Sequence, residues 1–171
     1  IVDSICLKTL ENEELAKFQI ETTSYLHRYT KSSFISKEKD EIHKYRLIHT
    51  PTQTVYSSKP HKWQEGYKVF ISTTSTYKTF IDDCGMTQSI AFIRCKTKQE
   101  AQFYKKILDH DLYKFLNNIC RWGNFNNIRI LQSFPIPHLA IAGCSSLRET
   151  DVIWNNFNLT KEEIDFIKKS V

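Results

Sequence analysis

The sequence is short of the residues that make long flexible connections and of those that mark a membrane protein. It has four glycines and four prolines among 171 residues, which excludes long low-complexity linkers. No apolar run is long enough to cross a membrane, and the first residues lack the basic segment and apolar core of a signal peptide. The chain begins at Ile1 rather than Met and has a single methionine, so we expect a piece of a longer protein.

The cysteines do not form a recognisable framework. There are five, an odd number, and they are widely spaced: Cys6, Cys84, Cys95, Cys120 and Cys144. No CxxC pair and no Cys/His cluster occurs, which disfavours a zinc site. Reduced, buried thiols in an intracellular protein are the favoured interpretation, and we therefore expect a cytoplasmic location and no membrane partner.

Signatures of phosphate cradles are missing too, since the chain contains neither a Walker loop nor a GxGxxG sequence. Hydrophobic residues make up 40% and charged residues 25%, as in ordinary globular proteins. The length suffices for one domain with a core, or for one domain and a small appendage. The formal charge of +5 permits an anionic partner such as nucleic acid without requiring one.

Hydrophobic periodicity predicts strands near residues 43–49, 67–72, 88–95 and 128–134. A helical hairpin is predicted over 98–120, because Thr97 and Glu100 have capping-box spacing and Asp111 is suited to cap a second helix. Thr160 and Glu163 repeat the capping-box spacing before a terminal helix over 161–169. A further helix is expected over part of 11–29, no clear period is seen in 1–10, and 52–66 is expected to be a long loop.

These elements predict an α/β fold, with a small mixed β-sheet packed against the helical hairpin and flanked by N- and C-terminal helices. We divide the chain into an N-terminal helical or connecting segment (1–42), an α/β core (43–137) and a C-terminal tail with its terminal helix (138–171).

Candidate catalytic groups are few. Asp82 and Asp83 are adjacent carboxylates, but with Cys84 and Gly85 after them they favour a turn over an acid–base pair or a metal site. The six histidines do not gather at metal-ligand spacing, and no catalytic triad is evident from the sequence. We therefore expect no metal and no catalytic residue in this chain.

Basic, aromatic and amide residues instead gather in three segments. Their charged and polar side chains are suited to phosphates, guanine edges and adenine edges. The alternative is a solvated charged surface. For the aromatic residues we favour this alternative and expect Trp122 and Phe125 to anchor their loop into the core, because aromatic side chains contribute mostly through burial. The candidate DNA-binding residues are Lys59, His61 and Lys62; Lys68, Ser72, Thr73, Thr74, Ser75, Tyr77 and Lys78; and Arg121, Asn124, Asn126, Asn127 and Arg129.

The order and spacing of several segments resemble the C-terminal target-recognition (TaqI-like specificity) region of DNA adenine-N6 methyltransferases of restriction–modification systems, fused restriction–modification enzymes included. HKYRLIHT and GYKVFIS look like two strands of that region. FIDDCGMTQSIAFIRCKTKQEAQFYKKIL looks like its Asp–Gly turn, apolar strand and helix. LYKFLNNICRWGNFNNIRILQSFPIP and LTKEEIDFIKKSV look like its later helix, aromatic–Gly–Phe–Asn loop, final strand and acidic terminal helix.

The resemblance implies a module that recognises a target sequence in double-stranded DNA and holds the duplex for a catalytic domain, in which the target base is flipped. That family's catalytic half carries an Asn/Asp-Pro-Pro-aromatic motif and binds S-adenosylmethionine. No such motif occurs here, because the four prolines are isolated. We therefore expect no cofactor in this fragment, no methyl transfer by it, and S-adenosylmethionine in a catalytic domain upstream in the same parent chain.

Two other functions stay open at this point. A small metal-dependent nuclease would use Asp82, Asp83 and the histidines. A protein-interaction module of a restriction complex would instead present an exposed apolar patch. The recognised DNA sequence, the oligomeric state and any cleavage by the parent enzyme do not follow from this sequence.

Overall fold

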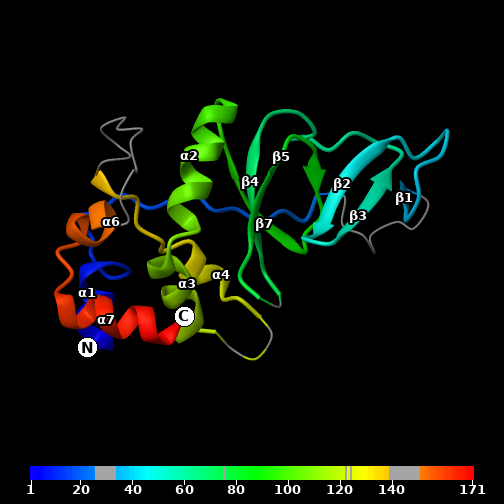
Figure 1. The fold of residues 1–171 in the computed structure, drawn as a ribbon. Helices are drawn as coiled ribbons and strands as arrows, with labels where there is room; N and C mark the ends of the chain where they lie inside the picture. Colours follow the sequence, from blue (N-terminus) through cyan, green and yellow to red (C-terminus); the bar gives the residue numbers. More distant parts are fainter. Residues whose placement is uncertain (26–33, 75, 122, 124, 139–150) are drawn as a thin grey trace. The chain divides into compact units, whose positions relative to one another are not determined.

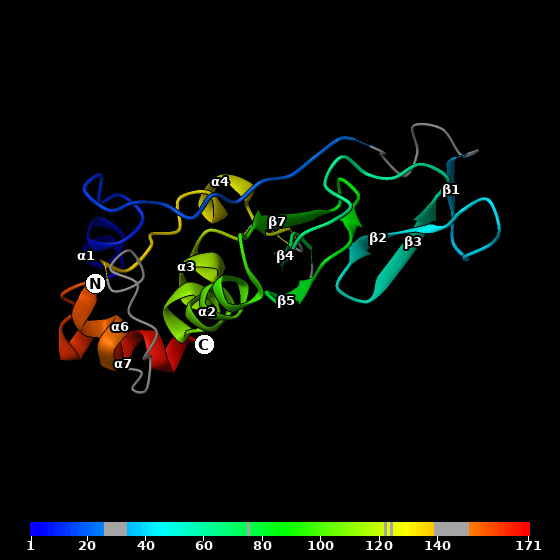
Figure 2. The same cartoon turned by 90° about the horizontal axis from the view of Figure 1, so that it is seen from above.

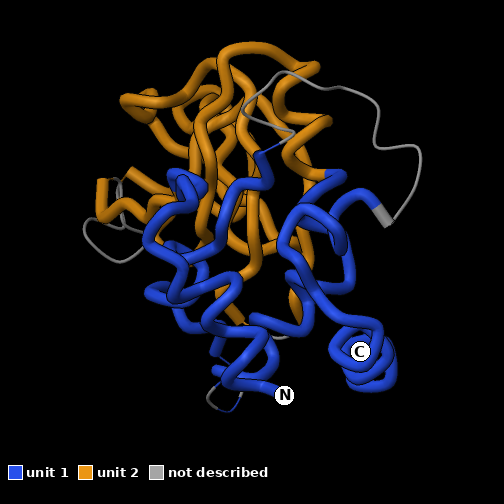
Figure 3. Tube along the Cα trace, turned by 90° about the vertical axis from the view of Figure 1, so that its left-hand side faces the viewer, with its two compact units in different colours: residues 1–19, 106–171 blue, residues 20–105 orange. Residues whose placement is uncertain are grey.

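A computed structural model describes residues 1–25, 34–74, 76–121, 123, 125–138 and 151–171. The chain forms two compact units, shown in different colours in Figure 3. Unit 1 contains Ile1–Gln19 and Lys106–Val171, and unit 2 contains Ile20–Lys105. Within the described ranges no helix has the length and apolar character needed to span a membrane. The mixture of helices and two small sheets confirms the predicted α/β class.

The first sheet of unit 2 is mixed. Its order is β1-β3-β2-β6, and β6 runs parallel to β2 while the other pairs are antiparallel. Figure 1 shows β2 and β3 as neighbouring arrows joined by a short turn. Thr50 pairs with Gln53 at that turn, so Pro51 and Thr52 form its tip. The strands are β1 (Ile35–Ser36), β2 (Tyr45–Thr50), β3 (Gln53–Ser57) and β6 (Gly85–Met86).

The second sheet of unit 2 is antiparallel, with the order β5-β4-β7. Figure 2 shows β4 between its two partners. All five residues of the central strand are buried, as the apolar run predicts. Phe70 faces Phe80 across the β4–β5 pair, with ring centroids 5.2 Å apart. The strands are β4 (Lys68–Ser72), β5 (Thr79–Asp82) and β7 (Ile90–Arg94).

The two sheets of unit 2 share one hydrophobic core. Ile48 and Met86 come from the first sheet, whereas Phe70, Ile90 and Phe92 come from the second. Trp63 and Phe80 cover this cluster. The shared core explains why the short strand β6 is kept in register, since a two-residue strand has little stability of its own.

The two helices of the predicted hairpin are present as α2 (Lys98–Leu108) and α3 (Asp111–Ile119). The Thr97 side chain accepts from the backbone N–H of Glu100 at 3.1 Å, as the capping-box spacing predicts. His110 rather than Asp111 caps α3, since its Nδ1 accepts from the backbone N–H of Leu112. The helix starts one residue earlier than a cap at Asp111 predicts.

Unit 1 is helical and is built around α3. Tyr113 packs edge-on against both Phe18 and Phe134, and its hydroxyl donates to the Pro135 carbonyl at 2.6 Å. Phe115 packs against Phe166 of the terminal helix. Within the described residues of this unit, the other helices are α1 (Val2–Lys8), α4 (Ile128–Leu131), α6 (Asp151–Asn156) and α7 (Lys161–Ser170).

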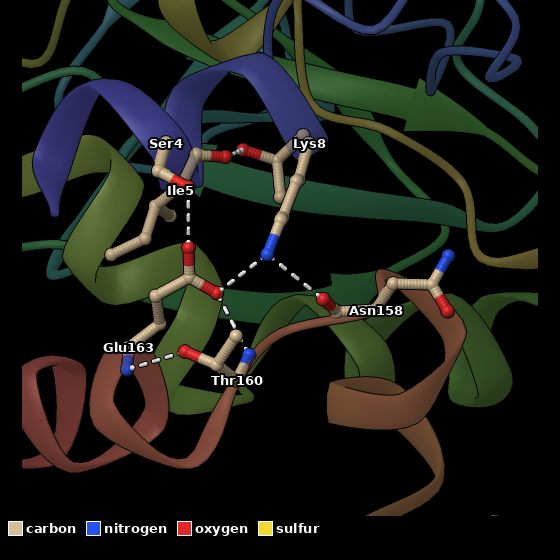
Figure 4. A network of polar contacts seen from close by, with 7 residues as sticks. Ser4, Ile5, Lys8, Asn158, Thr160 and Glu163 are labelled. Atoms are coloured by element: carbon tan, nitrogen blue, oxygen red, sulfur yellow. Dashed lines mark hydrogen bonds and ion pairs between the residues drawn. The ribbon is translucent and has the colours of Figure 1, made fainter.

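A buried carboxylate joins the two ends of the chain inside unit 1. Glu163 accepts from the Ser4 hydroxyl at 2.6 Å and from the Lys8 ammonium at 2.8 Å, as Figure 4 shows. Lys8 also donates to the Asn158 carbonyl at 3.0 Å. The capping box predicted for Thr160 and Glu163 is confirmed, with both of its hydrogen bonds present. The terminal helix therefore begins where the sequence places it.

Three predicted elements are wrong, and they were decided by capping, by pairing with a distant segment and by a tight turn. The first is the strand over 128–134, which is the short helix α4 instead. The Asn127 side chain accepts from the Arg129 N–H and caps this helix, so a local side-chain bond outweighs the β propensity of the isoleucines. Pro135 then adopts extended backbone in a bridge with Lys17.

The helix expected over part of 11–29 is absent from its described residues, 11–25. Their backbone bonds go to other segments: Phe18 donates to the Phe134 carbonyl, and Glu21 exchanges two hydrogen bonds with Phe92. Residues 26–29 lie outside the described ranges. The N-terminal helix instead is α1, in the stretch where no period was recognised.

The loop expected over 52–66 contains β3, which pairs along its whole length with β2. The hairpin was missed because Pro51 was taken as the end of a strand and not as part of a tight turn.

Candidate nucleic-acid interface

Basic residues are unevenly divided between the two units. The range of unit 2 contains fourteen lysines and arginines against eight aspartates and glutamates, a formal charge of +6. The ranges of unit 1 contain ten against eleven, a formal charge of −1. The excess positive charge of the chain therefore belongs entirely to unit 2. A compact basic unit attracts polyanions more strongly than the same charge spread over the chain.

The first predicted set follows β3 in unit 2, and its two lysines are exposed. The Lys59 ammonium lies 4.3 Å from the Phe34 ring centroid, and the Lys62 ammonium lies 4.2 Å from that of Trp63. Arg94 covers the same indole at 4.5 Å, and its guanidinium donates twice to Glu21. Aromatic rings thus hold cationic side chains at the surface, a combination found in nucleic-acid interfaces.

His61, the third member of that set, is 3% exposed and is turned into the protein. Its Nδ1 accepts from the Trp63 N–H at 3.0 Å, and its own backbone N–H donates to Gln64. Burial lowers the His61 pKa to about 4, with further contributions from Lys62 and Lys68. The imidazole is therefore neutral near pH 7 and shapes the loop, and a direct phosphate contact is not available to it.

We expect His61→Asn to change the pH dependence of stability. Asparagine retains an acceptor for the N–H two residues on but does not titrate. Since the folded pKa lies below the unfolded value of 6.5, the stability associated with neutral His61 is present above pH 6.5 and is lost as the pH falls to about 4. Wild-type protein should therefore lose about 2 kcal/mol more than the variant over this window, measured by urea unfolding. Parallel curves for both proteins would contradict this assignment.

Lys68 opens the second predicted set, but it is only 1% exposed. Its ammonium donates to the backbone carbonyls of Trp63 at 2.5 Å, Glu65 at 3.0 Å and Cys84 at 3.0 Å. These three bonds use all the donors of the ammonium group. Lys68 therefore fastens the loop that carries Lys62 and Trp63, and it is not exposed to a phosphate.

Other members of the second set stabilise the connection between β4 and β5. The buried Ser72 hydroxyl donates to the Thr76 carbonyl and accepts from the Lys78 N–H, both at 2.9 Å. Thr73 donates to the Ser89 carbonyl at 2.7 Å. Ser75 lies outside the described residues. The hydroxyls of this segment thus divide into structural ones and surface ones.

The remaining members, Thr74, Tyr77 and Lys78, line a surface pocket of about 410 Å³. The other wall of the pocket is the end of the β2–β3 hairpin, which the sequence analysis did not identify as part of a site. It consists of Thr50, Pro51, Thr52 and Gln53, and Thr76 completes the lining. The signal for this wall was present in the alternation of Val55 and Ser57 inward against Thr54 and Tyr56, which indicates a second strand. Only the folded hairpin brings the two segments together.

The third predicted set lies in unit 1, and several of its side chains are buried or engaged in hydrogen bonds and so are not accessible to a nucleic acid. Asn126 is buried and its side chain accepts from Asn117, Asn127 caps α4, and Arg121 is half-buried. Arg129 is exposed. Asn124 and Trp122 lie outside the described residues. Phe125 is 67% exposed, so the expectation that it anchors the loop into the core is wrong.

Asp82 and Asp83 do not face each other as a catalytic pair. The Asp82 carboxylate accepts from the Arg46 guanidinium at 2.6 Å. Burial acts to raise the Asp82 pKa, but the hydrogen bond and charge of Arg46, together with the hydrogen bonds from Asp83, outweigh it, and the pKa is lowered. Asp83 is exposed. Within the part of the chain that the structure describes, no three His, Cys, Asp or Glu side chains gather as a metal site.

Fold and surface together define an α/β protein with a basic unit that carries one lysine, several hydroxyls and one amide around a pocket. In comparisons with known proteins, no family model and no curated protein matches the chain.

Proposed function

We propose that this chain is the DNA-recognition domain of a restriction–modification DNA adenine methyltransferase. It is non-catalytic by itself and positions double-stranded DNA for an S-adenosylmethionine-dependent catalytic domain upstream in the same parent chain. The order and spacing of the segments from residue 43 to residue 137, together with the terminal helix, support assignment to this family. The net positive charge of unit 2 supports DNA as the ligand.

The observation that carries the proposal is the concentration of net positive charge in unit 2, at +6 against −1 for unit 1. Three exposed lysines of the predicted set, Lys59, Lys62 and Lys78, belong to this unit. Lysines at such positions bind phosphates, which supplies most of the affinity for DNA. Neutral hydroxyl and amide groups beside Lys78 add hydrogen bonds to backbone oxygens or base edges.

The test is binding to a fluorescent mixed-sequence duplex, followed by anisotropy at 50 mM and 200 mM salt. If three lysines neutralise phosphates, the slope of log K against log salt is about −2.7, and affinity falls roughly 40-fold over this range. An acidic polymer without bases, such as heparin, serves as competitor and reports the purely electrostatic part. Absence of duplex binding even at 50 mM salt would overturn the proposal.

A second candidate, a protein-interaction module of a restriction complex, is supported by exposed apolar side chains of unit 1. Ile1, Leu7 and Val171 are 51%, 62% and 46% exposed. Such side chains favour contact with another protein surface. Association with a partner in the absence of DNA, lost when Leu7 is replaced by serine, would support this function.

A further inference from the structure

Unit 2 has a second shallow pocket, which shares lining residues with the first. It measures about 370 Å³ and is lined by Lys37, Thr52, Gln53, Thr54 and Val55. Thr52 and Gln53 line both pockets. The two hollows therefore lie next to each other at the end of the β2–β3 hairpin, and together they form a polar surface with Lys78 in one pocket and Lys37 in the other. We call this the hairpin track.

The charged groups that the structure describes in the hairpin track are all positive. Among the residues that the structure describes, Lys37 and Lys78 are the only charged side chains in its lining, and no carboxylate contributes to it. Between them lie neutral hydrogen-bonding groups, namely one amide, one phenol and the threonine hydroxyls. Such a surface repels no anion and offers donors to phosphate oxygens and sugar oxygens.

Strand pairing and hydrogen bonds fix the backbone on both sides of the hairpin track. The hairpin end is closed by the Thr50–Gln53 pair, and β3 is flanked on its other side by β1, which directly precedes Lys37. On the opposite wall, Ser72 bonds both the Thr76 carbonyl and the Lys78 N–H. A ligand therefore meets groups whose backbone is already ordered, which lowers the entropic cost of binding.

We propose that the hairpin track binds the sugar–phosphate backbone of one strand of duplex DNA, with phosphates at Lys37 and Lys78. This inference rests on the proposed DNA-recognition function and assigns it a backbone-contacting surface. A pocket of about 410 Å³ lies within the size range of small-ligand sites and so admits the sugar of a nucleotide as well as its phosphate. The contacts fix the position of the duplex and carry no sequence information.

The experiment compares Lys37→Ala, Lys78→Ala and the double variant with the matched controls Lys44→Ala and Lys98→Ala. The control residues are exposed lysines of the same unit that line neither pocket. Duplex affinity is measured by anisotropy over a salt series, and melting by circular dichroism confirms folding. Each track variant should make the salt slope shallower by about 0.9 and the double variant by about 1.8, whereas the controls retain the wild-type slope.

Gln53→Ala supplies a variant without a charge change. It should weaken binding several-fold to all duplexes alike and leave the salt slope unchanged, because it removes a neutral hydrogen bond. If Gln53→Ala or Lys78→Ala alters the preference among duplex sequences, the track contacts bases and the backbone assignment is wrong.

The remaining outcomes separate the two proposals. Wild-type binding with track variants indistinguishable from Lys44→Ala and Lys98→Ala would overturn the hairpin track and leave DNA recognition standing. No wild-type binding at low salt would overturn both.

Discussion

Replacement of Lys68 by methionine is expected to lower the free energy of unfolding of unit 2 by about 3 kcal/mol, the largest effect that we expect in this unit. Methionine matches the length of the aliphatic stem, so the variant leaves little cavity. It leaves the carbonyls of Trp63, Glu65 and Cys84 without the ammonium donor that each now has. Each buried unsatisfied carbonyl costs about 1 kcal/mol or more.

Burial lowers the Lys68 pKa, because removing the charged ammonium from water costs free energy. The expected loss is therefore smaller than three full hydrogen bonds to a charged group. Lys98→Met is the matched control, since Lys98 is exposed in the same unit and the side-chain change is identical. Urea unfolding should show a lower midpoint for Lys68→Met and a shift below about 0.5 kcal/mol for Lys98→Met. Equal midpoints for the two variants would show that the carbonyls find other partners.

Replacement of Glu163 by alanine is expected to lower the free energy of unfolding of unit 1 by about 3 kcal/mol. The carboxylate is 5% exposed and accepts from Ser4, Lys8 and the Thr160 N–H, which join α1 to the start of α7 (Figure 4). Removing one partner of a buried charge pair costs more than the pair contributes, because the other charge stays behind. Lys8 is partly exposed, which limits the loss.

Two variants separate the charge from the packing. Glu163→Gln keeps the volume and one acceptor oxygen, so it should lose roughly half as much as alanine. Glu162→Ala changes an exposed acid in the same helical turn and should shift stability by less than about 0.5 kcal/mol. If Glu163→Ala and Glu162→Ala unfold at the same denaturant concentration, the buried network contributes nothing.

The same carboxylate makes stability depend on acid pH. Burial acts to raise the Glu163 pKa, but hydrogen bonds from Lys8, Ser4 and Thr160 outweigh it and lower the pKa to about 2. Because the ordinary value is 4.5, this contribution is complete above pH 4.5 and is lost as the pH falls toward 2. Glu163→Gln should lose the pH dependence of this window, which lies mostly below the window of His61.

Much of the local structure followed from the sequence because its signals act over a few residues. The apolar run KVFIS predicts the central strand β4, and the Thr–x–x–Glu spacings predict the starts of α2 and α7. A capping box is formed by residues three apart and needs no distant partner. The α/β class and the basic balance of the chain were likewise available from composition and periodicity.

Tertiary contacts decided the rest. Whether Glu21 continues a helix or pairs with Phe92 depends on a strand 71 residues away. Whether Lys68 meets a phosphate or three carbonyls depends on the loop folded over it. Lysine is ordinarily a surface residue, so composition placed it among the DNA contacts. Thr52 and Gln53 lie opposite Thr74 and Lys78 only after two hairpins have folded. Local signals such as capping boxes and apolar runs determine some helices and strands, whereas burial and pairing between distant segments determine the others and decide which polar groups remain at the surface to bind a ligand.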